Sequence, residues 1–259
     1  MTERRETVSV LILAKNEAAR IGRCLERTQW ADEVLVVDDM STDQTAEICR
    51  QHGARVVQRV FDNFSDQANF GLAHVMGSWV LSLDADELVT PRLREQIQRA
   101  VTQASDCVGF TFKRLNYFLG HCMYYGGWHH DVLHLFRRDA GRFAGKVHHT
   151  PQLVGTIRHL DADVEHYPFQ SLCQFVNRQN RYTSMEAQEI FEQFGDRLRI
   201  KVDQEIRVRP LKLAWKFYVK KQGFREGMHG LVFSVLFAWV HFLKWAKYWE
   251  LAHSRPCHM

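Results

Sequence analysis

The chain has 259 residues, of which 46% are hydrophobic and 25% are charged. These proportions exclude a disordered chain and predict one sizeable core with an appendage. The six cysteines contain no CxxC pair, which argues against a disulfide framework and favours reduced thiols in a cytosol. We expect no signal peptide, because Met-Thr-Glu-Arg-Arg-Glu leads directly into an apolar run.

The net charge of +4 is unevenly distributed along the chain. Residues 201–259 carry 11 Lys or Arg and 4 Asp or Glu, a balance of +7, whereas the remaining 23 basic and 26 acidic residues give −3. The same segment holds 11 aromatic residues. A basic and aromatic tail predicts an anionic partner surface, either nucleic acid or lipid headgroups.

Apolar runs predict four strands in the first hundred residues, at 8–13, 33–37, 54–58 and 79–83. Helical patterns separate them at 17–29, at a segment capped by Ser41 or Thr42 and stopped by Gly53, and at 65–76. Pro91 opens a further helix that runs to about Gln103. This alternation predicts an α/β fold with a doubly wound, mostly parallel sheet.

The second half of the chain is less regular. Residues 108–113 and 133–138 are predicted to be strands, residues 120–130 a loop, and the chain helical from 171 onward. Residues 228–249 are almost purely apolar and aromatic. The uncharged run 231–240 is nevertheless too short to span a bilayer, which takes about 20 residues.

Two carboxylates directly follow the strand at 79–83. Asp84 and Asp86 are separated by one residue, so on an extended backbone both side chains point the same way and can reach one cation. Their hard oxygen ligands suit Mg²⁺ or Mn²⁺ better than zinc. Asn16, Glu17 and Asp39 follow the other strands, and ligands of such sheets bind beyond the carboxyl ends of the strands.

These segments together resemble family 2 of the inverting, metal-dependent glycosyltransferases, whose fold is called GT-A. The resemblance is carried by Val10-Leu-Ile-Leu-Ala-Lys-Asn-Glu17, Val36-Val-Asp-Asp-Met-Ser-Thr-Asp43, Asp66-Gln-Ala-Asn69 and Ser82-Leu-Asp-Ala-Asp-Glu87. The rest of the chain resembles one bacterial subgroup, the β-1,4-glucosyltransferases that act on a heptose of the lipopolysaccharide inner core. Its softer signals include Gly127-Trp128, Leu135-Phe-Arg-Arg138 and Arg181-Tyr-Thr183.

The resemblance implies a GT-A catalytic domain at residues 1–168, with a nucleotide-sugar-binding half at 1–105 and an acceptor half at 106–168. A helical, basic and aromatic region at 169–259 follows it. The implied reaction moves a hexose, glucose in that subgroup, from a UDP-linked donor to a heptose of the lipopolysaccharide core. An alternative acceptor is another lipid carrier such as polyprenyl phosphate, and an alternative role is a catalytically silent nucleotide-sugar-binding scaffold.

The resemblance also implies roles for individual residues. Asp84 and Asp86 hold Mg²⁺ or Mn²⁺ on the donor diphosphate, and Asp131 is the general base. The implied nucleotide-binding residues are Ala14, Asn16, Glu17, Asp39, Gln67, Asn69 and Asp84. The implied acceptor or diphosphate residues are Trp128, Arg137, Arg138 and His148. The chain departs from the subgroup at His149, where similar sequences often carry Glu, and at His134, where they often carry Arg.

The basic tail favours a membrane surface over nucleic acid, for which no recognition motif is present. Lys212, Lys216 and Lys220 are spaced to share one helical face, with Trp215 among them. We therefore expect a cytoplasmic protein that is peripheral on the inner face of the bacterial inner membrane, with a lipid-linked saccharide acceptor.

Overall fold

The computed structural model describes residues 5–104, 106–144 and 150–253, with the backbone alone at residues 199 and 200. The chain forms two compact units. The first, called here the sheet unit, comprises Met1–Leu115 with His130–His166, and the second, the helical unit, comprises Asn116–His129 with Tyr167–Met259.

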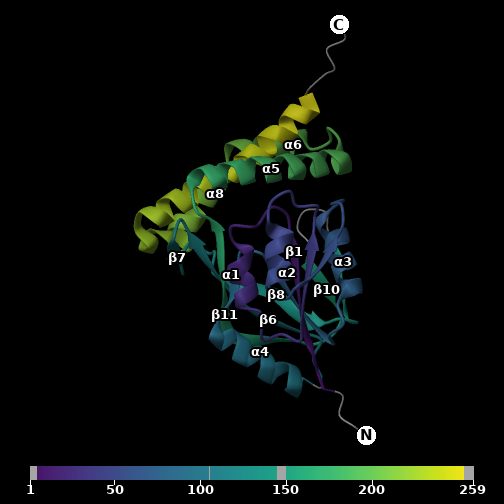
Figure 1. Ribbon diagram of the computed structural model, residues 1–259. Helices are drawn as coiled ribbons and strands as arrows, with labels where there is room; N and C mark the ends of the chain where they lie inside the picture. The colour runs from purple at the N-terminus through teal and green to yellow at the C-terminus, as the bar shows by residue number, and fades with distance from the viewer. Residues whose placement is uncertain (1–4, 105, 145–149, 254–259) are drawn as a thin grey trace. The chain divides into compact units, whose positions relative to one another are not determined.

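The sheet unit begins with four parallel strands in the order β3-β2-β1-β4. They are β1 (Val8–Ala14), β2 (Glu33–Asp38), β3 (Arg55–Gln58) and β4 (Trp79–Asp84), and the helices between them are α1 (Ile21–Glu26), α2 (Thr45–Gln51) and α3 (Phe64–His74) (Figure 1). β1 is buried along almost its whole length. Its continuous apolar sequence therefore fits a strand covered on both faces.

The other strands extend the sheet beyond β4. These strands are β8 (His130–Arg137), β6 (Gly109–Phe118), β7 (His121–Met123), β11 (Ile157–Phe169) and β5 (Glu87–Val89). β8 pairs antiparallel with both β4 and β6, and β11 pairs antiparallel with β5. The expected α/β fold is confirmed, but the described sheet of nine strands is mixed, because the parallel strands β1 to β4 are joined by strands that pair antiparallel, such as β8 with β4.

Side chains that accept backbone N–H groups mark where α4 and α2 begin. α4 (Pro91–Gln103) begins at Pro91, as predicted, and Thr90 caps it by accepting the Leu93 N–H. The prediction of Ser41 or Thr42 as N-cap is wrong for α2, which begins at Thr45. The Asp43 carboxylate accepts the Thr45 N–H instead, because acidic side chains compete well for free amides at a helix start.

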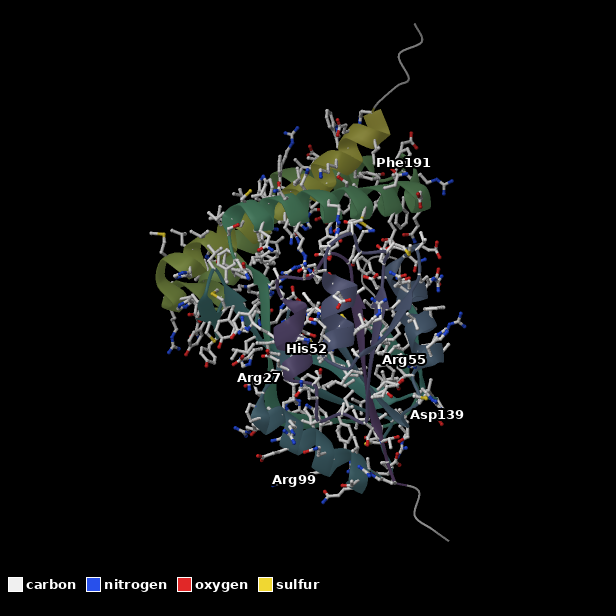
Figure 2. All side chains as sticks on the ribbon, in the orientation of Figure 1. Arg27, His52, Arg55, Arg99, Asp139 and Phe191 are labelled. Atoms are coloured by element: carbon white, nitrogen blue, oxygen red, sulfur yellow. The ribbon has the colours of Figure 1, made fainter. Side chains whose placement is uncertain are left out.

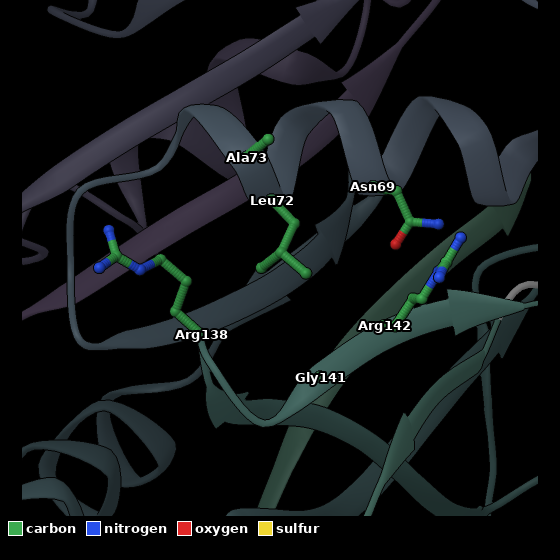
Figure 3. Close-up of a pocket in the computed structure, with 6 residues that line it drawn as sticks. All are labelled: Asn69, Leu72, Ala73, Arg138, Gly141 and Arg142. Carbon is green, nitrogen blue, oxygen red and sulfur yellow. The ribbon is translucent and has the colours of Figure 1, made fainter.

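α3 packs on the sheet through a core that includes Leu11, Val37 and Leu72. A separate two-stranded hairpin, β9 (Gly141–Ala144) and β10 (Thr150–Leu153), lies against α3. The side-chain amide of Asn69 holds it there, because Asn69 both donates to and accepts from the backbone of Phe143, each at 2.9 Å. Asn69 also lines a shallow pocket of about 490 Å³ with Leu72, Ala73, Arg138, Gly141 and Arg142 (Figure 3).

Charged side chains such as Arg27, Arg55 and Arg99 lie on the outside of the sheet unit (Figure 2). The described cysteines are all free thiols. Burial raises the pKa of Cys24 well above its usual value and that of Cys49 to about 11. Both thiols are therefore protonated at neutral pH, and they act as small apolar core residues.

The helical unit contains α5 (Leu172–Phe194), α6 (Arg199–Arg207), α7 (Arg209–Trp215), η1 (Lys216–Lys220), η2 (Gly223–Glu226) and α8 (Gly227–His253). Its core joins the 116–129 segment to the helices through Phe118, Met123, Phe169, Phe175 and Phe233. The stretch Gly223–His253 is long and apolar enough to cross a membrane by length and composition. It is longer than the run expected from the sequence, because the helix continues through His241, Lys244 and Lys247.

Candidate metal and nucleotide site

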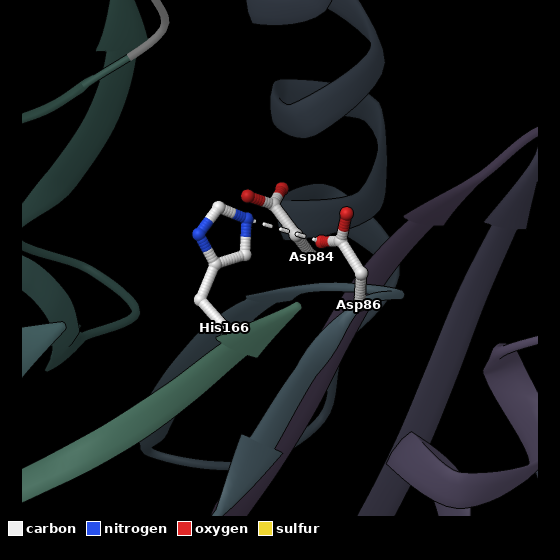
Figure 4. A group of neighbouring side chains, drawn as sticks. All are labelled: Asp84, Asp86 and His166. Carbon is white, nitrogen blue, oxygen red and sulfur yellow. Dashed lines mark ion pairs between the residues drawn. The ribbon is translucent and has the colours of Figure 1, made fainter. Parts of the chain in front are cut away.

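Two aspartates and a histidine meet beyond the carboxyl end of β4. Asp84 is the last residue of β4, Asp86 lies in the tight turn before β5, and His166 comes from β11, which pairs with β5. One ligand atom from each of the three lies within 4.8 Å of the others (Figure 4). The His166 Nε2 atom is 3.4 Å from Asp86 Oδ1.

This set of donors fits a divalent cation. Two carboxylates and an imidazole supply hard oxygens and one nitrogen, which suits Mn²⁺ or Mg²⁺. Asp86 and His166 are almost fully buried, whereas the Asp84 side chain is 43% exposed, so the cluster has an open side. The sequence missed His166 because 80 residues separate it from Asp86 and no motif marks it. Only the β5–β11 pairing brings them together.

A buried ion-pair network supports the two aspartates. Glu87 is fully buried, accepts the backbone N–H of Asp84 at 2.9 Å and pairs with Arg114 Nε at 2.7 Å. Arg114 Nη2 is 3.3 Å from Asp84 Oδ2. On the other side, Arg20 bridges Asp86 and Glu17, at 3.4 Å and 2.5 Å. The aspartates are therefore held between two guanidinium groups.

The charges around Asp84 set its protonation state. Desolvation and the neighbouring Asp86 carboxylate raise the pKa of this carboxyl, but the Arg114 guanidinium, with His166 and His134, outweighs them and brings the pKa below its usual value. Burial has the opposite effect on His134 and lowers its pKa, because burial disfavours the charged imidazole. The His134 Nδ1 atom is within hydrogen-bond distance of the Ser82 carbonyl oxygen. At neutral pH Asp84 is thus an anion, and His134 is a neutral imidazole that donates to the backbone.

The loops after β1 and β2 join at the same edge of the sheet. The parallel register places Ala14 beside Asp38, and Leu13 beside Asp84. Asp39 pairs with Lys15 at 2.6 Å and accepts the Phe61 N–H at 3.0 Å. These contacts fix the Asp39 carboxylate at the carboxyl end of the parallel strands.

Asn16 connects the two loops. Its side-chain oxygen accepts the Thr42 N–H at 2.8 Å, and its own N–H donates to Ser41 Oγ at 2.9 Å. Asn16 has a φ of 54°, in the left-handed region that Asn tolerates. Glu17 follows it and donates its N–H to Thr45 Oγ1 at 2.8 Å. The β1 loop is therefore ordered by side chains of the β2 loop.

Several predicted site residues lie elsewhere in the sheet unit. Gln67 donates to the Arg59 carbonyl, and Asn69 is engaged by the β9 backbone, so both support α3 and its neighbours. Arg137 pairs across the sheet with Trp79, the first residue of β4, at the end of that strand away from Asp84. Arg138 donates to the Val75 carbonyl at 3.0 Å. The expectation that Arg137 and Arg138 flank the diphosphate is therefore wrong, because β8 runs antiparallel to β4.

Asp131 is the second residue of β8, at the same edge of the sheet as Asp84. It lies opposite Lys113 in the β6–β8 register, and its carboxylate is 3.5 Å from His159 Nδ1. His130 lies opposite Arg114. Because neighbouring residues of a strand face opposite ways, Asp131 belongs to the face of Lys113 and not to that of Arg114. Its role as the base stays a prediction.

The two remaining predicted acceptor residues do not belong to the described part of the sheet unit. Trp128 belongs to the helical unit, where its ring packs against Phe233 and Phe237 at centroid distances of 5.0 and 5.2 Å. His148, like His149, lies outside the described residues.

Comparisons with known proteins identify a family for this chain. Residues 9–151 match the family model described as "Glycosyl transferase family 2". An uncharacterized glycosyltransferase of Rickettsia typhi is 28% identical over 265 residues, covering 95% of this chain and 87% of that protein. The lipopolysaccharide core biosynthesis glycosyltransferase LpsC of Rhizobium meliloti is 26% identical over 258 residues, covering 94% and 92%.

Two solved structures are similar at lower identity. Glucosyl-3-phosphoglycerate synthase of Mycobacterium tuberculosis, in complex with Mn²⁺, UDP and phosphoglyceric acid, has a TM-score of 0.49 and 16% identity, covering 71% of this chain and 78% of that one. Residues 1–349 of TarS from S. aureus, in complex with UDP-GlcNAc, have a TM-score of 0.49 and 14% identity, covering 96% and 91%. The family model spans more than half of the chain and includes Asp39, Asp84 and Asp86. The chain belongs to glycosyl transferase family 2, with the α/β GT-A fold.

Proposed function

We propose that this protein is an inverting, metal-dependent hexosyltransferase that moves glucose from UDP-glucose to a heptose of the lipopolysaccharide core. The observation that carries the proposal is the cluster of Asp84, Asp86 and His166 at the carboxyl edge of β4. Family membership supports glycosyl transfer, and the similarity to LpsC, along nearly the whole of both chains, supports the lipopolysaccharide core as the acceptor.

The donor would bind along the carboxyl edge of the parallel strands. Asp84, Asp86 and His166 would hold Mg²⁺ or Mn²⁺, which when bound neutralises charge on the departing diphosphate. Asp39 would accept a hydrogen bond from the uracil or ribose, and the loop from Ala14 to Glu17 would form the wall of the base pocket. Arg20 and Arg114 flank the aspartates and would supply the cationic charge that the sequence assigned to Arg137 and Arg138.

The reaction needs one direct displacement. The acceptor hydroxyl attacks the anomeric carbon, its proton passes to a carboxylate, and the bond from the anomeric carbon to the diphosphate oxygen breaks. We assign proton acceptance to Asp131, which lies at the same edge as Asp84, on the face of Lys113, and is about half exposed. Attack opposite the leaving group inverts the anomeric centre, and the products are the extended saccharide and UDP.

A second candidate acceptor is polyprenyl phosphate or another lipid carrier. Both acceptors are lipid-linked, so both place the protein on the cytoplasmic face of the inner membrane, where sugar nucleotides are found. A scaffold that binds a nucleotide sugar without reacting is the non-enzymatic alternative. Mass spectrometry of lipopolysaccharide from a strain lacking the gene separates them, since only the first proposal predicts a core shortened by one hexose.

Charge-removing substitutions test the metal cluster. Asp86→Asn should lower transfer from UDP-glucose by at least about 100-fold and weaken Mn²⁺ binding in isothermal titration, because a metal ion contributes several kcal/mol to charge stabilisation. Asp84→Asn should be severely impaired as well. Asp139→Asn, in the exposed turn after β8 (Figure 2), is the matched control and should behave as wild type. Full activity of both site variants in EDTA would refute the proposal.

A further inference from the structure

α7 and η1 form one helical segment with two adjoining exposed rows. Leu211, Trp215 and Val219 are 72%, 53% and 43% exposed and are spaced four residues apart. Lys212, Lys216 and Lys220 follow them one position later, and all three are exposed. η1 has π-helical geometry, closed by the Lys221 N–H to the Lys216 carbonyl at 2.8 Å. Its wider turn keeps residues four apart close to one line.

Two more large apolar side chains are exposed in the next elements. Phe224 in η2 is 51% exposed, and Met228 in the first turn of α8 is 70% exposed. We call the exposed side of these elements the 211–228 surface. It is formed by Leu211, Lys212, Trp215, Lys216, Val219, Lys220, Lys221, Phe224, Arg225 and Met228. Soluble proteins rarely leave so many large apolar side chains together in water, so such a patch indicates a binding surface.

These side chains are exposed although the helical segment that carries them packs against the rest of the helical unit. The opposite side of the same segment is packed: Phe217 contacts Phe233 and Phe237 at ring centroid distances of 5.9 and 6.4 Å. Gly223 lies so close to Gly230 that a Cβ on Gly230 would meet the Gly223 carbonyl. The helical unit thus covers one side of α7 and η1 in part, buries Gly223 and Glu226 of η2, and presents the other side.

The charge of this region is strongly positive. Residues 209–228 contain six basic side chains and one acidic one, Glu226. Glu226 is buried and already engaged by His121 and by the Tyr125 N–H, each at 2.7 Å. Within the part of the chain that the structure describes, no carboxylate forms an ion pair with the lysines of the 211–228 surface. Lys220 instead lies over the Trp215 ring, 5.0 Å from its centre.

We infer that the 211–228 surface binds the headgroup region of an anionic lipid bilayer, with α7 and η1 lying flat on it. Trp and Phe rings fit the boundary between acyl chains and headgroups, and lysine stems lie along apolar surface while the ammonium groups reach lipid phosphates. A second copy of the chain would place two rows of lysines against each other, which like charge disfavours.

α8 does not need to cross the bilayer for this binding. Its C-terminal half is fixed to α5, because Lys247 Nζ donates to Thr183 Oγ1 at 2.9 Å and Ser184 Oγ at 2.8 Å, and Lys244 pairs with Glu186 at 3.0 Å. Insertion of α8 across a bilayer would break these contacts and bury two ammonium groups in hydrocarbon. Membrane binding by this surface rests on the proposed function in one respect only. If the protein is the proposed transferase, binding would bring its site to a lipid-linked acceptor.

Vesicle binding by the full chain tests the surface. The protein should co-sediment with vesicles of phosphatidylcholine and phosphatidylglycerol, much less with phosphatidylcholine alone, and partly dissociate at high salt. The triple variant Lys212→Glu, Lys216→Glu, Lys220→Glu should partition about 100-fold more weakly. Brominated lipids should quench tryptophan fluorescence of the wild type, and less that of Trp215→Phe.

A charge-matched control separates this surface from general electrostatics. Arg50→Glu, Arg94→Glu and Arg99→Glu change the same net charge at exposed positions of the sheet unit and should leave binding nearly intact. Equal binding by the two triple variants would overturn the inference, as would a wild type that stays in the supernatant at low salt. A third result would also overturn it: the wild type is a dimer in sedimentation velocity, and Met228→Glu makes it a monomer without changing vesicle binding.

The same variants distinguish failure of this inference from failure of the proposed function. The lysine variant should retain Mn²⁺ binding and transfer to a detergent-solubilised acceptor, while it loses activity on acceptor in vesicles. A wild type that binds anionic vesicles but transfers no hexose from any sugar nucleotide would refute the proposed function and leave the surface in place. A lysine variant that is fully active on vesicle-borne acceptor would refute the surface.

Discussion

At the residue scale, a fully buried carboxylate decides how the aspartate pair is held. Glu87 accepts the Asp84 N–H and pairs with Arg114, which in turn contacts Asp84. A buried ion needs such partners, since leaving one charge unpaired costs about 3–5 kcal/mol. The arrangement keeps the turn after β4 rigid and the Asp84 carboxylate ionised, which are the two properties that a metal ligand requires.

The sequence could predict the aspartate pair but not its surroundings. Asp84 and Asp86 are recognisable because they follow an apolar strand at a spacing of two. His166 and Arg114 come from strands whose direction no local pattern reveals. The same limitation explains the incorrect placement of Arg137, because its distance from Asp84 depends on β8 running antiparallel to β4.

Replacement of Asp131 tests the proton acceptor. Asp131→Asn keeps the shape of the side chain, so Mn²⁺ and UDP affinities should be unchanged in isothermal titration, while kcat falls by about 10²–10⁴-fold. Asp161→Asn, another exposed aspartate of the sheet unit, is the control. Near-normal turnover of Asp131→Asn would indicate that the base lies on the face of Arg114. His130 of β8 is opposite Arg114 and is the candidate on that face.

At the element scale, segments with strong local signals were well predicted and others were not. β1, β2, β4 and α4 agree with the predicted ranges to within a residue or two, because apolar runs and Pro91 mark them. β7 and β10 are short and lie in polar, Gly-rich or His-rich stretches. Their pairing with β6 and β9 comes from tertiary context, which overrides propensity in short strands.

The packing of α3 on the sheet depends on a glycine. A Cβ at Gly71 would lie 2.5 Å from a methyl carbon of Leu11 and 2.9 Å from one of Val37, so the helix approaches the sheet too closely for a side chain. Gly71→Ala should therefore destabilise the sheet unit by about 1–3 kcal/mol in urea denaturation. The loss should appear as a lower midpoint with an unchanged slope.

Gly22 provides the matched control for this prediction. It is also helical, but a Cβ there meets its neighbours at 3.7 Å, an ordinary contact distance. Gly22→Ala should stabilise the protein by up to about 1 kcal/mol, because alanine is the better helix former. If Gly71→Ala were as stabilising as Gly22→Ala, the close approach of α3 would be wrong.

At the scale of the whole molecule, the chain does not divide into two consecutive parts. The sequence predicts a boundary at residue 168, between the catalytic domain and a helical region. In the structure the segment Asn116–His129 belongs with the helical unit, although it lies between strands of the sheet unit. Local patterns do not reveal this insertion, because the segment contributes Phe118 and Met123 to a core whose other members lie far along the chain.

Truncation tests this interleaved organisation. A chain ending at residue 168 keeps Phe118 and Met123 but loses Phe175 and Phe233, which cover them. We expect it to be aggregated or to unfold without a cooperative transition, since several large apolar side chains become exposed at once. Replacing 116–129 with a short Gly-Ser linker in the same truncated chain should restore solubility and a single thermal transition. A soluble chain of residues 1–168 that is resistant to proteolysis between 116 and 129 would show that the segment folds with the sheet unit instead.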